Sequence, residues 1–319
     1  MKSLFSRSLD HLFEGNGFGA PYGAPLALEC AFTEAYRQHE HSPVAERELA
    51  GMTIMFPAIL QPLGGGDLLA GRIRYPLVGQ SPEPMGLGYY CCHGALQQVA
   101  EHEGFTVDVR EQARQLSDYW ATRTTGAKTR AAFPRDMAGA LPRDNFIQER
   151  AAAYPLYRMG GSTLDYGKLL QLGLPGLRAD LATRKSGADD KAIRLYESME
   201  GALDVLAAGL RMYAAQARQL ALTASEQREA ELLALAGALE AVREQPPGTF
   251  LEAMQLFWLY ALQSGTWNYG RMDVYLGPFL VRDIAAGRLD ESRALMLVRS
   301  LWRLIADYDN MYNLSLIHI

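Results

Sequence analysis

The sequence predicts a helix-rich α/β fold, and three observations support this prediction. Apolar residues recur at steps of three and four along most of the second half of the chain, which is the spacing of helices with one buried face. Of the 319 residues, 49% are hydrophobic and 21% charged, so the chain can bury a sizeable core. Stretches rich in glycine and proline interrupt the helical spacing, and β-prone residues lie among them.

Charge and composition exclude several classes of function. The balance of 31 basic against 36 acidic residues gives a net charge of −5, which argues against nucleic acid as a partner. The N-terminus has no secretory signal, and the most apolar run, residues 250–262, is too short to cross a bilayer. Three cysteines are too few for a disulfide framework. We therefore expect a cytoplasmic protein without a membrane partner.

In the first half of the chain the helical pattern is less regular. Gly64, Gly65 and Gly66 lie in a tract rich in glycine and proline, at residues 60–88, which is the longest candidate loop. Around this tract the pattern predicts helices at about 24–40, 43–58, 108–121 and 163–183.

The longest predicted helix covers residues 188–222. One stripe of apolar side chains along it is expected to face the core: Ile193, Tyr196, Met199, Leu203, Leu206, Leu210, Tyr213, Ala217 and Leu220. A capping-box pattern, Thr223 with Glu226, predicts that the next helix begins there and continues to about Val242. Pro246 and Pro247 cannot continue it and indicate a turn.

A second capping-box pattern, Thr249 with Glu252, opens an apolar helix that should lie inside the core through about residue 263. Residues 264–280 combine glycines with β-prone side chains and predict a short strand or an ordered loop. A helix is expected from near Pro278 to Gly287, and Asp290 can cap a final helix that ends around residue 309.

Two clusters of polar residues are candidates for chemistry. Cys91, Cys92 and His93 are adjacent, but no second ligand pair at zinc spacing exists, so a structural role is favoured over a metal, redox or nucleophilic role. Arg271 and Asp273 follow the buried apolar helix, where unpaired charges are costly, so they should meet each other, another polar group or a substrate.

The aromatic residues beside the charged pair leave two interpretations open. Trp267 and Tyr269 could form the wall of a ligand pocket with a few fixed polar groups, or they could belong to the core. The sequence contains none of the common nucleotide-binding, zinc-protease or serine-hydrolase patterns.

A long stretch of the second half resembles the glycyl radical enzymes of the pyruvate formate-lyase-like superfamily. Its pattern reads T-F-x-E-A-M-Q, then an aromatic-rich helix, then G-R-M-D-x-Y-L-x-P and D-I-x-x-G-x-L. The matching residues, in order, are Thr249, Phe250, Glu252, Ala253, Gln255, Gly270, Arg271, Met272, Asp273, Tyr275, Leu276, Pro278, Asp283, Ile284, Gly287 and Leu289.

The resemblance extends upstream and covers nearly the whole chain. The segment GGSTLDYGKLLQLGLPGL, residues 160–177, is similar to a family stretch in which many members carry His or Arg where Gly161 stands here. In pyruvate formate-lyase an arginine of that stretch is implicated in holding the substrate carboxylate. The departure at Gly161 disfavours a pyruvate-like substrate, although Arg158 could reach the same space.

The resemblance implies a fold and a chemistry. Family members form a ten-stranded α/β barrel in which a glycine loop meets a cysteine loop. A radical S-adenosylmethionine activating enzyme with an iron–sulfur cluster installs the glycyl radical, and a cysteine radical then abstracts hydrogen from the substrate. In the family both loops follow the G-R-M-D stretch, and neither is present in this chain.

The expectation from the resemblance is thus an incomplete N-terminal portion, residues 1–319, of a pyruvate formate-lyase-type domain. Alone it should be inactive, with no catalytic residue, no metal and no directly bound cofactor, and its apolar tail suggests a truncated reading frame. When complete, the enzyme would be a homodimer that cleaves C–C or C–X bonds, or dehydrates a small polar substrate, in anaerobic metabolism. The substrate-binding residues expected are Arg158, Gly161, Trp267, Asn268, Arg271 and Asp273.

The alternative is a non-catalytic helical scaffold or interaction protein derived from the same fold. It would have to cap or pair the exposed part of the barrel, for example by dimerisation.

Overall fold

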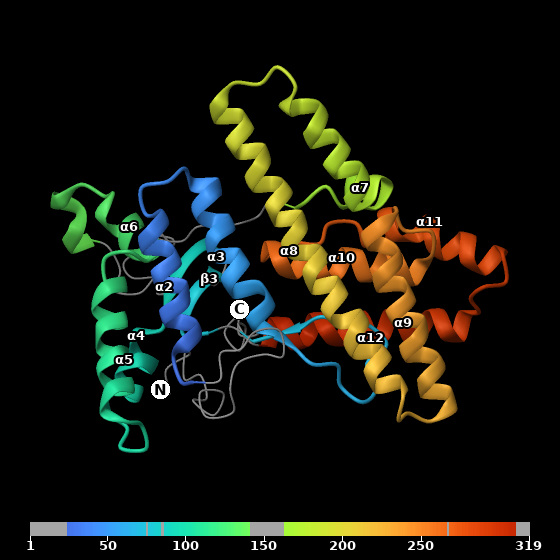
Figure 1. The fold of residues 1–319 in the computed structure, drawn as a ribbon, viewed down its shortest axis with the longest axis horizontal. Helices are drawn as coiled ribbons and strands as arrows, with labels where there is room; N and C mark the ends of the chain where they lie inside the picture. The colour runs from blue at the N-terminus through green and yellow to red at the C-terminus, as the bar shows by residue number, and fades with distance from the viewer. Residues whose placement is uncertain (1–23, 75, 84–85, 141–162, 267, 311–319) are drawn as a thin grey trace. The chain divides into compact units, whose positions relative to one another are not determined.

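The computed structural model describes residues 24–74, 76–83, 86–140, 163–266 and 268–310 and is predominantly helical (Figure 1). The chain divides into two compact units, one formed mainly by residues 22–38 and 75–162 and the other mainly by residues 39–74 and 163–319. The first unit contains α2 (Ala27–His39), β3 (Val78–Glu83), β4 (Gly86–Cys91), α4 (His93–Glu101), α5 (Val107–Trp120), α6 (Thr125–Ala131) and a 3-10 helix (Arg135–Ala140). The second contains α3 (Val44–Ile59), β1 (Leu60–Gln61), β2 (Arg72–Ile73), α7 (Tyr166–Lys185), α8 (Asp190–Ala221), α9 (Glu226–Glu244), α10 (Phe250–Ser264), α11 (Met272–Ala285) and α12 (Glu291–Asn310).

The first unit is built around an antiparallel hairpin of β3 and β4 and a cluster of buried aromatic rings. Trp120 at the end of α5 lies 4.8 Å from Tyr36 of α2 and 5.9 Å from Tyr89 of β4, measured between ring centroids. The Trp120 indole nitrogen donates to the Thr33 hydroxyl at 2.9 Å, so its one polar group is satisfied inside the core. These contacts hold α2 and α5 against the hairpin.

In the second unit the central element is α10. The Thr249 capping box is present, with the Thr249 and Glu252 side chains each accepting a backbone N–H, and Gly265 ends the helix in the left-handed conformation (φ 64°). Ten of its fifteen side chains are buried and the other five are partly buried, as an apolar sequence without a polar face requires. The prediction of a core helix at 250–263 is confirmed.

A buried amide and an indole fasten α10 to the segment between β1 and β2. Gln255 is fully buried, and its side chain accepts from Ala70 N at 2.8 Å and donates to Ala70 O at 3.0 Å. The Trp258 indole donates to Gly71 O at 2.7 Å. Gly71 has φ +119°, and a Cβ there would lie 2.6 Å from the Trp258 ring, so only glycine fits. The polar groups of this irregular segment are thereby satisfied without water.

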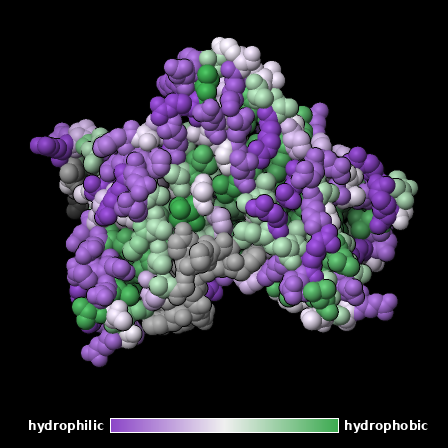
Figure 2. All heavy atoms as spheres, in the orientation of Figure 1, coloured by the Kyte–Doolittle hydropathy of each residue, from purple (hydrophilic) through white to green (hydrophobic). Residues whose placement is uncertain are grey.

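The helices α7 and α8 form a hairpin within the second unit (Figure 1). Inside α7, Gly173 adopts φ +61° and interrupts the helix where a Cβ would lie 2.7 Å from Pro246 Cα. Figure 2 shows that hydrophilic residues cover most of the outer surface of this hairpin. Among the described residues, no helix has the length and apolarity needed to cross a membrane.

Most of the predicted helices are confirmed within a few residues, and three predictions are wrong. Residues 272–280 are helical, so α11 begins near Met272 and contains Pro278, where a strand or loop was expected. The tract at 60–88 contains β1, β2 and most of the β3–β4 hairpin. The N-cap of α9 is Ser225 and not Thr223. The sequence analysis also missed α4 and α6.

The strands of the described residues form two small antiparallel sheets, β1 with β2 and β3 with β4. The helix-rich prediction is confirmed. The ten-stranded barrel and the assignment of residues 1–319 to one incomplete domain stay predictions about a longer protein.

Candidate functional site

The predicted substrate-binding stretches meet at the start of α7 and the loop between α10 and α11, which we call the α7–α11 junction. The Thr163 hydroxyl donates to Asn268 O at 2.9 Å across 105 residues of sequence. Gly270 N donates to the Asn268 side chain at 3.0 Å, closing a tight turn in which Gly270 has φ +59°. A Cβ at Gly270 would lie 3.1 Å from the Thr163 hydroxyl oxygen. The glycine of the G-R-M-D pattern therefore allows the two stretches to approach.

Arg271 and Asp273 form a two-pronged ion pair at the N-terminus of α11. The Arg271 Nε donates to Asp273 Oδ1 at 2.8 Å and its Nη2 to Oδ2 at 2.6 Å. This pairing lowers the pKa of the Asp273 carboxyl and raises the pKa of the Arg271 guanidinium. The expected pairing is confirmed, but the expected burial is wrong, because the two side chains are 76% and 65% exposed. Both are accessible to a ligand.

An aromatic cluster lies beneath the junction. Tyr166, the first residue of α7, packs edge-on against Phe257 of α10 at 4.8 Å and beside Tyr275 of α11 at 5.2 Å between centroids. The Tyr275 hydroxyl donates to Tyr269 O at 2.7 Å and so fixes the loop. Burial raises the pKa of Tyr166 and of Tyr275, which keeps both phenols protonated. The junction thus rests on a rigid, apolar base.

The structure places only half of the predicted binding residues. Asn268, Arg271 and Asp273 lie together at the junction. Arg158, Gly161 and Trp267 are outside the described residues, so their predicted roles are untested. The sequence analysis missed Thr163, and the only signal for it was its position inside the family-like stretch at residues 160–177.

The Cys91 cluster belongs to the first unit and has the features of a structural site. Cys91 Sγ lies 3.6 Å from His93 Nδ1, which in turn lies 3.1 Å from the Ser117 hydroxyl. Burial, together with the nearby Cys92 and Glu29, raises the pKa of the Cys91 thiol, and burial lowers that of His93. A neutral thiol is a poor nucleophile and metal ligand. Across the described ranges, no group of three His, Cys, Asp or Glu side chains could hold a metal ion.

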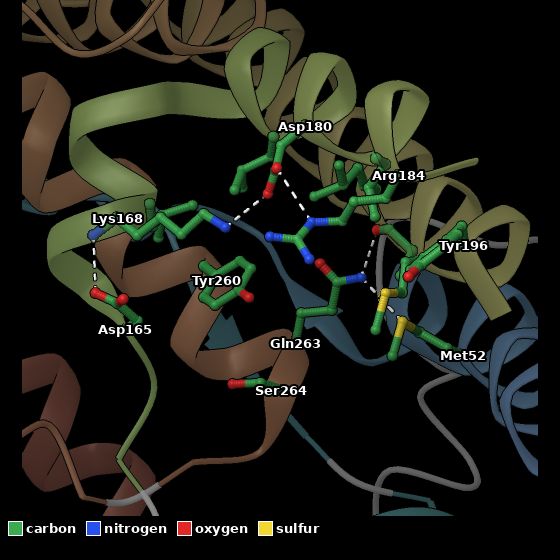
Figure 3. A pocket seen from close by; sticks show the side chains of 15 residues that line it. Met52, Asp165, Lys168, Asp180, Arg184, Tyr196, Tyr260, Gln263 and Ser264 are labelled. Carbon is green, nitrogen blue, oxygen red and sulfur yellow. Dashed lines mark hydrogen bonds and ion pairs between the residues drawn. The ribbon is translucent and has the colours of Figure 1, made fainter. Parts of the chain in front are cut away.

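A cavity of about 470 Å³ adjoins the junction in the second unit (Figure 3). Its walls come from α3, α7, α8 and α10, and they are mainly apolar. Asp165, the N-cap of α7, and Ser264, the last residue of α10, reach it from the two stretches that form the junction. The sequence analysis missed this cavity and assigned its Tyr196 and Met199 to the core stripe.

Comparison with protein families gives one extended match. The family model described as pyruvate formate lyase-like matches residues 26–314, which is most of the chain.

Two curated relatives match over a similar range and a third over about half of it, and all three are much longer. Trans-4-hydroxy-L-proline dehydratase of Clostridioides difficile is 27% identical over 299 residues, covering 85% of this chain and 36% of the relative. Isethionate sulfite-lyase of Oleidesulfovibrio alaskensis is 25% identical over 313 residues, covering 88% of this chain and 37% of the relative. The probable dehydratase YbiW of Escherichia coli is 32% identical over 156 residues, covering 44% of this chain and 19% of the relative. The chain therefore spans little more than a third of the length of these relatives.

Solved structures show the same fold relationship. A B12-independent glycerol dehydratase from Clostridium butyricum matches with a TM-score of 0.67 and 19% identity, covering 88% of this chain and 37% of its own. A glycyl radical enzyme from Archaeoglobus fulgidus matches with a TM-score of 0.65 and 21% identity, covering 88% of this chain and 38% of its own. At these identities the likeness concerns the fold alone.

Proposed function

Because the chain belongs to the pyruvate formate lyase-like family of glycyl radical enzymes, we propose that it is the N-terminal part of a radical dehydratase or lyase acting on a small polar molecule. The match over residues 26–314 carries this proposal. The relatives reported above are dehydratases and a sulfite-lyase, which supports elimination of water or another group. Cleavage of a C–C bond and acyl transfer of the formate acetyltransferase kind have less support, and Gly161 further disfavours a pyruvate-like substrate.

The role proposed for this chain is to form one wall of the substrate pocket. Beside the ion pair, Arg271 Nη1 makes no hydrogen bond among the described residues and the Asp273 oxygens can accept further bonds, so this accessible surface suits a substrate with hydroxyl or anionic groups. The Asn268 side chain is fixed by its hydrogen bond from Gly270 N, which orients its amide group at the junction. Arg158, Gly161 and Trp267, which the sequence predicted as substrate-binding residues, belong to the same wall in this proposal.

The aromatic base of the junction has a second role in the proposal. Tyr166, Phe257 and Tyr275 exclude water from beneath the pocket, and a dry pocket strengthens the polar contacts made to the substrate. The glycyl radical, installed elsewhere in the longer protein by a radical S-adenosylmethionine iron–sulfur activating enzyme, would supply the cysteine radical that abstracts hydrogen from the substrate. Burial keeps Cys30 and Cys91 protonated within the first unit, and we assign no radical role to either. We propose that the longer protein is a homodimer.

Substrate turnover by the longer protein tests this proposal. The full reading frame, activated anaerobically, would be incubated with glycerol, 1,2-propanediol, isethionate, trans-4-hydroxy-L-proline and pyruvate. We expect consumption of a hydroxylated compound and no cleavage of pyruvate. Turnover of pyruvate to formate alone would contradict the proposed reaction class.

A matched pair of variants on α11 tests the proposed wall. Arg271→Gln removes a charged donor at the junction and should lower kcat/KM by about tenfold or more. Arg282→Gln lies at the other end of the same helix and should leave kcat/KM unchanged. Equal kcat/KM values for the two variants would remove Arg271 from the substrate site.

A further inference from the structure

The cavity beside the junction has the make-up of a ligand site that the proposed reaction does not use. Leu169 and Leu181 of α7 and Met199 of α8 supply apolar walls, and Tyr196 and Tyr260 supply two aromatic rings. A volume of about 470 Å³ lies within the range of pockets that hold small organic molecules. An apolar body of one or two rings therefore fits its interior.

The mouth of the cavity carries two cations and one shared carboxylate. Asp180 accepts from Lys168 Nζ at 2.6 Å and from Arg184 Nε at 3.1 Å, and the Lys168 bond is the first cause of its lowered pKa. Asp165, the other carboxylate here, accepts from Lys168 N and caps the N-terminus of α7. Two cations and two carboxylates therefore line the cavity, and their charges balance before a ligand binds.

Arg184 presents its unused donors to the cavity. Its Nε faces Asp180, whereas Nη1 and Nη2 make no hydrogen bond with the described residues. Figure 3 shows the guanidinium group extending over the cavity towards Tyr260 and Gln263. Two coplanar N–H groups that face an apolar cavity match the geometry of a carboxylate.

Two further polar groups line the same space. Gln263 Nε2 donates to Ala202 O at 2.7 Å and to Met52 Sδ at 2.9 Å, and its Oε1 makes no hydrogen bond among the described residues. The Tyr260 hydroxyl likewise has no partner there, and burial, with the charge of Asp165, raises its pKa and keeps it a donor. The Tyr260 hydroxyl can donate to a carboxylate, whereas Gln263 Oε1 is an acceptor and makes no bond to that group.

We propose that the cavity between α3, α7, α8 and α10 binds a small molecule with an apolar body and one carboxylate, which pairs with the Nη1 and Nη2 groups of Arg184. The apolar body packs against Met199 and the tyrosine rings. This site is separate from the wall formed by Arg271 and Asp273, and the proposal does not depend on the radical reaction.

Calorimetric titration of the 319-residue chain tests this proposal with three probes of one shape. These are 4-phenylbutyrate, the neutral 4-phenylbutan-1-ol and the cationic 4-phenylbutylamine. We expect a single site for 4-phenylbutyrate, at least about tenfold weaker binding of the alcohol and no binding of the amine. Absence of saturable 4-phenylbutyrate binding up to about 1 mM, or equal affinity for the alcohol, would overturn the proposal.

Matched arginine variants of α7 locate the binding. Arg184→Gln should weaken 4-phenylbutyrate binding by at least about tenfold. Arg178→Gln is the control, because Arg178 pairs with Asp204 and does not line the cavity. Circular dichroism would confirm that both variants fold. Equal affinity in the two variants would place the ligand elsewhere and overturn the proposal.

A cavity-filling variant, studied by sedimentation velocity, tests whether a small molecule or a second copy of the chain occupies the cavity. Ala202→Leu adds volume inside the cavity and should also weaken 4-phenylbutyrate binding. The sedimentation coefficient should be the same for this variant and the unchanged chain. A loss of dimer on Ala202→Leu would mean that another copy fills the cavity, which would contradict the proposal.

Discussion

The two halves of α8 carry the same apolar repeat but lie in different surroundings. In the C-terminal half, Leu206, Leu210 and Tyr213 are fully buried against neighbouring elements of the second unit. In the N-terminal half, Met199 remains 45% exposed, and it lines the cavity with Tyr196. A helical period therefore indicates which face is apolar, whereas the neighbouring helices decide whether that face is packed or left open.

Truncating one apolar residue in each half of α8 should give the largest difference in the free energy of unfolding. Leu206→Ala leaves a void in the core and should lower the free energy of unfolding by about 2–5 kcal/mol. Met199→Ala removes a half-exposed side chain at an open cavity and should cost less than about 1 kcal/mol. Urea unfolding followed by circular dichroism measures both. Similar losses for the two variants would mean that the cavity is closed and packed in solution.

Two carboxylates, one near each half of α8, should differ by a smaller amount in their contribution to the free energy of unfolding. Glu231 of α9 is 14% exposed and accepts from Arg293 at 2.8 Å and Arg228 at 3.0 Å. Burial acts to raise its pKa, but the two arginines outweigh it, so the pKa is lowered from its ordinary 4.5. Asp180, at the cavity mouth on α7, is 30% exposed, about twice as much as Glu231. The ion pairs of Glu231 should therefore matter more to stability.

The pH dependence of unfolding checks this comparison. Because the pKa of Glu231 is lower in the folded state, its contribution is complete above about pH 4.5 and is lost as the pH falls through the folded value. Glu231→Gln should cost about 1 kcal/mol at pH 7, and this cost should shrink below about pH 4. Asp180→Asn is the control and should have a smaller effect at both pH values. A cost for Glu231→Gln that stays constant down to pH 3 would exclude the ion pairs as its cause.

Local signals in the sequence predicted the helices well where side chains form their own caps. Thr249 with Glu252, and Asp290 with Arg293 N at 2.7 Å, fix helix starts through contacts within four residues. Residues 272–280 show the limit of such signals. Pro278 lies in the second turn of α11, whereas the sequence predicted that the helix begins near Pro278, after a strand or loop.

The candidate site was predictable in its residues but not in its assembly. The pattern G-R-M-D indicated Arg271 and Asp273, and the two side chains pair as expected, although both are exposed and the cost of buried charge does not explain the pairing. The bond from Thr163 to Asn268 joins positions 105 residues apart, and the cavity needs four helices at once. Neither leaves a local pattern, because each depends on long-range packing. The activating enzyme, the homodimer and the cytoplasmic location stay predictions.

The most direct test of the central claim is electron paramagnetic resonance of the protein encoded by the full reading frame. The protein would be treated anaerobically with its radical S-adenosylmethionine activating enzyme and measured before and after exposure to air. Our account predicts a glycyl radical signal that oxygen destroys. No signal, with an activating enzyme that installs the radical in another family member, would contradict the enzyme proposal and favour a non-catalytic scaffold.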